Sequence, residues 1–422
     1  MRLGRRGDGS DMTGHVCRSC GLDQFRTLCD LGMSPFANAY VKPENLDSPE
    51  LFFPLHALVC EACFLVQLAQ FQTPSEIFSE YAYFSSVSES WVQHAKAYTL
   101  AMRERFGLHS RSLVVEIASN DGYLLQHFKN AGVPVLGIEP AANVALEAKA
   151  LGIPTLVEFF GSALAERLAG EGRRPDLMVG NNVLAHVPEL NDFVHGVKLM
   201  LAPHGVATFE FPHLERLMEQ SQFDTIYHEH FCYFSLIALA PVFERQGLKL
   251  FDVEELSTHG GSLRVYVQHE DSGRHPVEAR LGELLERERR NGFERLGTYE
   301  AFAEHVRDAK RRLLAFLIGV KREGKSVVGY GAPAKGNTLL NYCGVRQDFL
   351  DYVVDKNPHK QGLYLPGVRI PIQPPGRIAE TRPDYVLILP WNLKDEVMRQ
   401  MAHIREWGGR FVAPIPTAQV LD

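Results

Sequence analysis

The sequence predicts an α/β protein with a small N-terminal zinc module and two Rossmann-like domains. Three features predict it: two series of apolar strands alternating with helical patterns, a charged helical stretch between them, and two Cys-x-x-Cys pairs near the start. A chain of 422 residues can form two or three separate cores. Buried strands that alternate with helices are typical of a parallel sheet with helices on both faces.

The composition excludes several classes of partner. The chain has 44 basic and 51 acidic residues, a formal net charge of −7, and no sustained basic block, so we expect no binding to nucleic acid. No apolar run approaches the roughly 20 residues of a membrane-spanning helix, and residues 1–13 contain no secretory signal. We therefore expect a cytoplasmic monomer or small homo-oligomer without a membrane partner, preceded by a disordered leader at 1–13.

The paired cysteines predict a structural zinc site within residues 14–75. In a reducing compartment, clustered thiols are better read as metal ligands than as a disulfide framework. Four thiolates complete a tetrahedral shell around zinc and leave no position for a substrate. The predicted ligands are Cys17, Cys20, Cys60 and Cys63. Because the two pairs are far apart, Cys29, His15 or His56 is an alternative for one ligand.

The first α/β pattern spans residues 76–272 and begins with a helical stretch to residue 107. Its four apolar strands are expected at 112–118, 133–139, 176–182 and 205–211. Two alternating strands follow at 248–256 and 262–269, which predict an antiparallel hairpin that closes the edge of the sheet.

The remaining residues predict a connection and a second domain. Residues 273–322 are rich in Arg, Glu, Leu and Ala at helical spacing, which predicts long connecting helices. Residues 323–422 repeat the α/β pattern, with strands expected at 326–331, 351–355, 384–390 and 410–415.

A polar turn after the first strand predicts a cofactor pocket. The segment Glu116-Ile-Ala-Ser-Asn-Asp-Gly122 has a single glycine, which disfavours the pyrophosphate site of a dinucleotide. Glu139 ends the next strand, where an acid accepts hydrogen bonds from both ribose hydroxyls of a nucleoside; the alternative is a cap for the following helix. These features favour S-adenosylmethionine. The predicted cofactor-binding residues are Glu116, Ala118, Asn120, Gly122, Tyr123, Glu139, Asn181 and Asn182.

Ionisable side chains gather in Tyr227-His-Glu-His-Phe231, in a loop beyond a predicted strand end. Such a group suits general acid–base chemistry, which needs a base of near-neutral pKa and donors for a developing oxyanion. Structural packing of the aromatic rings is the alternative. A metal site is less favoured, because alternate side chains of an extended segment point to opposite faces. His186 follows the strand at 176–182 and is a second acid–base candidate, or a buried core histidine.

A glycine-rich turn, Gly329-Tyr-Gly-Ala-Pro-Ala-Lys-Gly-Asn337, opens a helix in the second domain. Its glycines, its free amides and Lys335 can receive a phosphate, so a diphosphate on the substrate would suit it. The equal alternative is a helix N-terminus in a nucleotide fold that has lost its ligand.

Together these strings resemble a known family almost end to end: the sugar C-methyltransferases that use S-adenosylmethionine and act on thymidine-diphosphate (dTDP) 4-keto-deoxysugars. The matching strings are the paired Cys-x-x-Cys motifs, Tyr81-Ala-Tyr-Phe-Ser-Ser-Val-Ser-Glu-Ser-Trp91, Glu116–Tyr123, Tyr227–Phe231, Thr258-His-Gly-Gly-Ser262 and Gly329–Asn337. The resemblance implies a zinc module, a methyltransferase core and a C-terminal domain that helps to hold the nucleotide-sugar.

The resemblance also implies roles for particular residues. The implied active-site residues are Tyr81, His186, Tyr227, Glu229 and His230. The implied substrate-binding residues are Tyr83, Ser85, His259, Lys335 and Asn337.

The chemistry follows from that substrate class, because a hydrogen beside a ketone can be removed once the enolate is stabilised. We expect methylation alpha to the 4-keto group, at carbon 3 or, less favoured, at carbon 5. His230 would be the base and Glu229 would orient it or its hydrogen-bond partner, while Tyr227, Tyr81 and His186 stabilise the enolate oxygen. The alternatives are an O-methyltransferase acting on a sugar hydroxyl and a non-catalytic nucleotide-sugar-binding protein.

Overall fold

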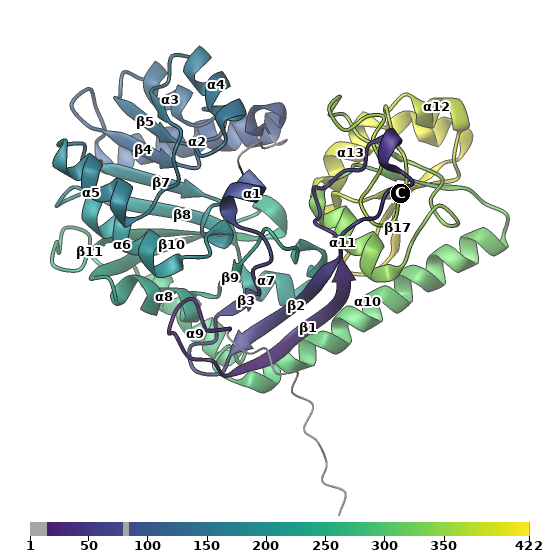
Figure 1. Ribbon diagram of the computed structural model, residues 1–422, viewed down its shortest axis with the longest axis horizontal. Helices are drawn as coiled ribbons and strands as arrows, with labels where there is room; N and C mark the ends of the chain where they lie inside the picture. Colours follow the sequence, from purple (N-terminus) through teal and green to yellow (C-terminus); the bar gives the residue numbers. More distant parts are fainter. Residues whose placement is uncertain (1–14, 79–83, 422) are drawn as a thin grey trace, which may run out of the picture.

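The structure is a computed structural model that describes residues 15–78 and 84–421. Two α/β lobes are joined at their base by antiparallel strands and one long helix, so that the molecule has the outline of a V (Figure 1). The expectations for residues 1–13, Tyr81 and Tyr83 fall outside the described residues.

The sheet at the base is antiparallel and has the strand order β1-β2-β3-β9. Its strands are β1 (Phe25–Ser34), β2 (Phe53–Cys60), β3 (Val66–Leu68) and β9 (Cys232–Tyr233). Strand β9 directly follows the Tyr227–Phe231 string, so the central domain contributes the last strand of the sheet that the zinc module forms. The sequence did not predict this pairing, because a strand of two residues has no periodicity to detect.

The sheet of the first lobe has the order β10-β11-β8-β7-β4-β5-β6, in which β11 and β10 run antiparallel to the other strands. Its strands are β4 (Val114–Ile117), β5 (Val135–Ile138), β6 (Thr155–Leu156), β7 (Leu177–Asn181), β8 (Val206–Pro212), β10 (Leu248–Leu256) and β11 (Ser262–His269). The four predicted strands and the hairpin at the sheet edge are confirmed. Only the two-residue β6 was not predicted.

Helices cover both faces of this sheet. One face packs against α2 (Glu89–Phe106), α3 (Leu125–Asn130) and α4 (Ala142–Ala150). The other packs against α5 (Ser162–Gly170), α6 (Leu190–Met200), α8 (Leu236–Glu244) and α9 (Ala279–Arg290). A short helix, α7 (Leu214–Glu219), follows β8. Among the described helices, none is both long enough and apolar enough to span a membrane.

The helix expected over residues 76–107 is interrupted. The structure describes a short helix, α1 (Pro74–Phe78), and a 3-10 turn, η2 (Ser85–Val87), before α2 begins at Glu89. Ser88 caps α2, because its hydroxyl accepts a hydrogen bond from the Trp91 amide at 3.4 Å. Serines compete with the helix for backbone hydrogen bonds, so they favour caps over helix interiors.

The second lobe contains a six-stranded sheet of order β14-β13-β12-β15-β16-β17, parallel except at β17. Its strands are β12 (Val327–Tyr330), β13 (Val353–Val354), β14 (Ile372–Gln373), β15 (Tyr385–Ile388), β16 (Arg410–Ala413) and β17 (Gln419–Leu421), and its helices are α11 (Ala334–Cys343), α12 (Arg377–Thr381) and α13 (Lys394–Gln400). The four predicted strands are all present, which confirms a second Rossmann-like sheet.

The base sheet and the second lobe share one hydrophobic core. Helix α10 (Leu296–Arg322) runs beneath β1 and β2 toward the second lobe (Figure 1). Its buried face joins Leu28 and Leu55 of the base sheet to Leu339 of α11 in a single cluster. The base sheet and the second lobe therefore do not have separate cores, because α10 and the base sheet connect the lobes through continuous apolar packing.

Candidate active site and zinc centre

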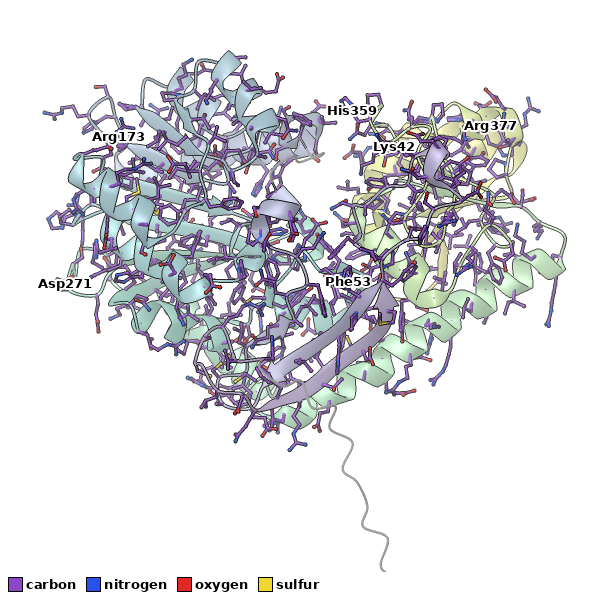
Figure 2. The ribbon with its side chains drawn as sticks, in the orientation of Figure 1. Lys42, Phe53, Arg173, Asp271, His359 and Arg377 are labelled. Atoms are coloured by element: carbon purple, nitrogen blue, oxygen red, sulfur yellow. The ribbon has the colours of Figure 1, made fainter. Side chains whose placement is uncertain are left out.

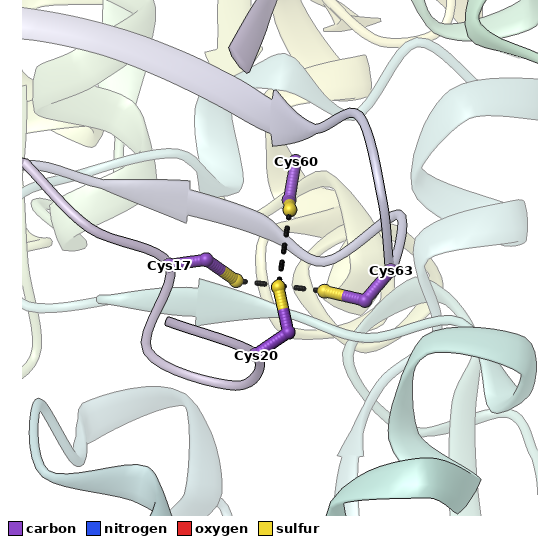
Figure 3. Close-up of side chains that lie close together, drawn as sticks. All are labelled: Cys17, Cys20, Cys60 and Cys63. Atoms are coloured by element: carbon purple, nitrogen blue, oxygen red, sulfur yellow. Dashed lines mark hydrogen bonds between the residues drawn. The ribbon is translucent and has the colours of Figure 1, made fainter. Parts of the chain in front are cut away.

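Four cysteine sulfurs form a cluster next to the base sheet (Figure 3). Cys60 ends β2 and Cys63 lies in the turn before β3, while Cys17 and Cys20 come from a turn closed by the Gly21 amide. All four Sγ atoms lie within 4.8 Å of one another, and the pairs Cys17–Cys63 and Cys20–Cys60 are 3.5 Å apart. Tetrahedral zinc with bonds of about 2.3 Å would separate its sulfurs by about 3.8 Å, so the cluster fits structural zinc.

The alternative zinc ligands lie elsewhere. Cys29 is buried in β1 within the shared core. The Nε2 atom of His56 is bonded to the Thr27 hydroxyl at 2.9 Å, and the ring of His15 stacks near Phe25. The predicted four-cysteine set is therefore the one that the fold assembles.

Two buried acids stand at the carboxyl ends of β4 and β5. Glu139 accepts hydrogen bonds from the Asn120 amide at 2.8 Å and from the Ala141 amide at 2.9 Å. The alternative role of Glu139, a cap for the following helix, is thus partly correct, because its carboxylate accepts hydrogen bonds from two loop amides. Each carboxylate oxygen still has a lone pair for a ribose hydroxyl. Burial raises the pKa of Glu139, and it raises the pKa of Glu116 well above its usual range.

Several buried polar atoms at these strand ends have no hydrogen-bond partner among the described residues. They are Glu116 Oε2, Ser119 Oγ, Asp121 Oδ1, both side-chain polar atoms of Asn181, and Asn182 Oδ1. Buried polar atoms are normally paired, and unpaired ones cost about 1–3 kcal/mol each. Donors and acceptors left open at one sheet edge fit a polar nucleoside with an amino-acid tail, as in S-adenosylmethionine.

The turn between β4 and α3 has a strained backbone at three predicted cofactor residues. Ala118, Asn120 and Gly122 have φ values of 54°, 48° and 79°. A Cβ on Gly122 would lie 2.4 Å from Ile153 Cδ1, so this glycine is needed for packing against the sheet's own core.

The segment after the gap at 79–83 covers this turn. The Ser85 amide donates to Asn120 Oδ1 at 2.9 Å, and the Ser86 amide donates to Asp121 Oδ2 at 3.0 Å. On α2, the ring of Trp91 lies 6.0 Å from Tyr123 and 5.1 Å from His259. Ser85, Tyr123 and His259 are therefore gathered at the cofactor edge, although they are far apart in sequence.

His230 is held in one tautomer. Its Nδ1 lies 2.9 Å from the Thr225 carbonyl oxygen, which can only accept, so Nδ1 carries the proton and Nε2 keeps its lone pair. Burial lowers the pKa of His230 well below its usual range, which keeps the ring neutral. The ring lies 4.0 Å from Tyr227 and 4.7 Å from His186, centroid to centroid. A neutral imidazole with a free Nε2 can act as a base.

His186 is fixed in the same way by the loop that carries His230. Its Nδ1 donates to the Glu229 carbonyl at 2.8 Å, and burial lowers its pKa to about 4. Its Nε2 is therefore an acceptor, which cannot donate a hydrogen bond to an enolate oxygen. The expected donor role of His186 is wrong for this tautomer.

Glu229 does not orient His230, which is a second correction. The Glu229 carboxylate accepts from Asn38 Nδ2 at 2.7 Å, and its other oxygen is buried without a partner. Burial raises the pKa of Glu229 to about 7. The base is oriented instead by the backbone of Thr225, and Glu229 is a half-protonated acid near neutral pH.

The remaining histidine of the motif, His228, contacts the base of the molecule. Its Nε2 lies 3.2 Å from the Pro54 carbonyl, and its ring packs edge-on against Phe36, Phe53 and Phe71. Figure 2 labels Phe53 where the base strands meet both lobes. The segment is not extended as expected: His228 and Glu229 form a turn closed by the His230 amide, which donates to the Tyr227 carbonyl at 2.9 Å. This turn brings the rings of Tyr227 and His230 together, while His228 packs against the base.

A small pocket opens beside His230, lined also by Ala185, Thr225 and Tyr233. A larger depression in the second lobe is lined by Tyr352, Gln373 and Arg377. Figure 2 places Arg377 on the outer side of that lobe, whereas His359 faces the first lobe. The larger depression therefore lies away from the acid–base residues.

The glycine-rich turn of the second lobe is used mainly for packing. A Cβ on Gly331 would lie 2.6 Å from Pro390 Cδ, and one on Gly336 would lie 3.0 Å from Leu389 Cβ. Asn337 is buried and donates to the Ala37 carbonyl at 2.6 Å. The expected role of Asn337 as a substrate ligand is therefore not supported, because its donor already holds the base segment.

Lys335, in the same turn, points toward the catalytic loop. Its Nζ donates to Asn392 Oδ1 at 2.9 Å and lies 4.5 Å from the centre of the Trp391 ring. Trp391 donates to Asp224 Oδ2 at 2.7 Å. Sequence reasoning missed Asn38, Trp391 and Asn392, because no pattern in the strings around them signals a site.

Comparisons with known proteins cover nearly the whole chain. A family model described as a zinc binding domain matches residues 17–78, a methyltransferase domain matches 91–253, and a C-methyltransferase C-terminal domain matches 257–416. The C-methyltransferase NovU of Streptomyces niveus is 37% identical over 406 residues, which cover 96% of each chain.

Solved structures resemble less than half of the chain. Magnesium protoporphyrin IX methyltransferase of Synechocystis PCC 6803 with bound S-adenosylmethionine is 15% identical, with a TM-score of 0.31, over 42% of this chain and 76% of that one. The PH0226 protein of Pyrococcus horikoshii OT3 is 14% identical, with a TM-score of 0.37, over 47% of this chain and 99% of that one.

The strand-end acids, the acid–base loop and the four-cysteine cluster occur together in a chain that matches a C-methyltransferase over nearly its full length. The protein belongs to the C-methyltransferase family, as an S-adenosylmethionine-dependent methyltransferase with an N-terminal zinc-binding domain.

Proposed function

We propose that the enzyme transfers a methyl group to the carbon alpha to the 4-keto group of a dTDP-linked deoxysugar, at carbon 3 in preference to carbon 5. The observation that carries this proposal is the fixed tautomer of His230, whose free Nε2 belongs to a neutral ring next to Tyr227 and His186. Carbon methylation requires a base that removes a C–H proton, and this ring can do so at neutral pH.

The chain's own residues divide the work. His230 removes the proton from the sugar, and the Tyr227 hydroxyl binds the sugar oxygen. Glu139 and the open polar atoms around Glu116 and Asn181 hold the cofactor. When bound, S-adenosylmethionine supplies an electrophilic methyl group on a sulfonium sulfur.

The division of the chain is part of the proposal. Residues 14–75 would bind zinc, 76–272 would perform the chemistry, 273–322 would connect the lobes, and 323–422 would help to hold the nucleotide-sugar. We place the enzyme in the cytoplasm, as a monomer or small homo-oligomer without nucleic-acid or membrane partners.

Replacing His230 tests the proposal. The variant His230→Asn should lose methyl transfer to dTDP-4-keto sugars by about three orders of magnitude, because general-base catalysis typically contributes 10²–10⁴-fold. Its affinity for S-adenosylmethionine, measured by calorimetry, should change less than about threefold. The matched control is His195→Asn, which alters an exposed histidine on α6 and should keep full activity.

Exchange of the alpha hydrogen for deuterium tests whether the enolate forms before methyl transfer. With a non-reactive cofactor analogue in heavy water, the wild-type enzyme should exchange the alpha hydrogen of the sugar for deuterium, and His230→Asn should not. Normal turnover by His230→Asn would reject this residue as the base. Absence of exchange in the wild type would reject a separate enolate, and carbon NMR of the product distinguishes a C-methyl from an O-methyl group.

A further inference from the structure

Lys335 of the second lobe lies within the catalytic region of the first. It occupies the first turn of α11, and its only hydrogen bond among the described residues goes to Asn392. Two of its three N–H donors therefore have no protein acceptor in the part of the chain that the structure describes. The side chain keeps some accessible surface, yet it is surrounded closely enough that burial lowers its pKa.

One short turn is bonded directly to His230 and is linked to Lys335 through Trp391. The 3-10 turn η4 (Phe223–Thr225) offers the Thr225 carbonyl to His230 and the Asp224 carboxylate to Trp391, whose ring lies against the Lys335 ammonium. One helical turn after Lys335, the Thr338 hydroxyl donates to the Ile226 carbonyl at 3.1 Å. Helix α11 is thereby bonded directly to the loop that orients the base.

The electrostatics agree with this placement. Burial is the main cause of the low pKa of His230 and of His259, and the positive charge of Lys335 lowers both further. Lys360, a neighbouring cation, acts differently: it donates to the Ala332 carbonyl and lowers the pKa of Glu229. Of these two lysines, Lys335 is the one whose charge lowers the pKa of the base, His230.

A carbanion next to a ketone needs a positive donor at the ketone oxygen, where the charge accumulates. His186 and His230 both carry their proton on Nδ1, bonded to backbone carbonyls, so neither offers an N–H from Nε2. A half-protonated Glu229 and the Tyr227 hydroxyl are neutral donors at best. The open N–H groups of Lys335 supply the missing charge.

We propose that Lys335 is a catalytic residue that donates a hydrogen bond to the ketone oxygen of the sugar as that oxygen becomes an enolate, and that Asn392, Trp391 and Asp224 position it. This inference rests on the proposed function. His230 Nε2 takes the proton from the alpha carbon, the C–H electron pair forms the carbon–carbon double bond, and the carbonyl pair moves to the oxygen held by Lys335. The role differs from the expected one, in which Lys335 binds the diphosphate.

The test distinguishes a role of Lys335 at the ketone from a role at the diphosphate. The variant Lys335→Met keeps an apolar stem on the Trp391 ring and removes the ammonium. It should bind thymidine diphosphate within about twofold of the wild type by calorimetry, and it should lose deuterium exchange at the alpha carbon of a dTDP-4-keto sugar by about 10²-fold or more. Lys335→Arg keeps a cation and should recover part of the exchange.

A diphosphate-binding lysine would give the opposite result. Thymidine diphosphate would then bind at least tenfold more weakly to Lys335→Met, while exchange at saturating sugar would stay within threefold of the wild type. That outcome overturns the inference and leaves the proposed function intact. A wild-type enzyme that neither exchanges nor methylates any dTDP-4-keto sugar overturns both.

The positioning residue gives an independent readout. Asn392→Ala should lower kcat for methyl transfer about tenfold with KM and the affinity for thymidine diphosphate unchanged. Asn392→Asp should restore kcat, because a carboxylate oxygen can accept the same hydrogen bond from Lys335. An unchanged kcat in Asn392→Ala, or a loss in KM alone, would contradict the positioning role.

Discussion

The two lobes contain the same local unit, a parallel strand followed by a polar turn and a helix, but the two copies have different polar groups left open. After β4, buried atoms of Glu116, Ser119 and Asp121 have no partner in the part of the chain that the structure describes. After β12, the Ala332 amide donates to Asp355 Oδ2 at 2.7 Å, and the Ala332 carbonyl accepts from the Tyr40 hydroxyl at 2.5 Å.

The difference shows what each turn is for. Buried polar groups that have no partner within the protein cost stability, and a polar ligand can satisfy them. The Ala332 amide and carbonyl are paired, so they stabilise the fold and are not open to a ligand. We therefore interpret the turn after β4 as the cofactor site, and the turn after β12 as a structural unit that presents Lys335 to the first lobe.

Replacing the strand-end acids should give the largest difference between the two turns. Glu139→Gln should weaken binding of S-adenosylhomocysteine about 100-fold or more, because two charge-assisted hydrogen bonds to a ribose contribute roughly 1.5–3 kcal/mol each. The matched control is Asp355→Asn, the corresponding acid after β13, which should leave that affinity within twofold. Calorimetry of both variants tests the comparison, and equal losses would show that the two turns are not functionally distinct.

The free energy of unfolding should depend on pH because of Glu229, the buried acid of the catalytic loop. Burial raises the pKa of Glu229 from 4.5 to about 7. Its contribution to stability is therefore full below pH 4.5 and is lost as the pH rises through 7, by up to about 3 kcal/mol. Glu229→Gln does not titrate, so its stability should rise relative to the wild type between pH 5 and pH 8.

Urea unfolding without ligand at the two pH values measures this difference. Glu300→Gln, on the exposed face of α10, controls for the general effect of removing one negative charge. A stability difference between wild type and Glu229→Gln that is independent of pH would show that Glu229 is not desolvated as described.

Two asparagines provide the smallest and most direct comparison. The Asn337 side chain donates to the Ala37 carbonyl through Nδ2, although its Oδ1 is buried without a partner among the described residues, so Asn337→Ala should lower the free energy of unfolding by about 1–3 kcal/mol without changing cofactor affinity. Asn181 has no partner, so Asn181→Ala should change stability by less than about 0.5 kcal/mol but weaken S-adenosylhomocysteine binding. Chemical denaturation and calorimetry on both variants measure the two effects, and a reversed pattern would contradict the assignment of the turns.

Much of the fold could be predicted, because strands and cysteine pairs leave local patterns. The apolar strands of both sheets, the edge hairpin and the four zinc ligands follow from periodicity and spacing. The break before α2 and the shared core beneath α10 could not, since they depend on a serine cap and on packing between distant segments.

For the candidate site, the sequence determined which chemical groups are present: strand-end acids, a Tyr/His/Glu loop and one lysine at a helix start. Only the tertiary structure decided how they are used. It sets the histidine tautomers through the backbone carbonyls of Thr225 and Glu229, pairs Asn337 with Ala37, and brings Lys335 to His230 across two lobes. The reason is physical: residue type fixes what a side chain can donate or accept, while its partners depend on contacts between segments that are far apart in the chain.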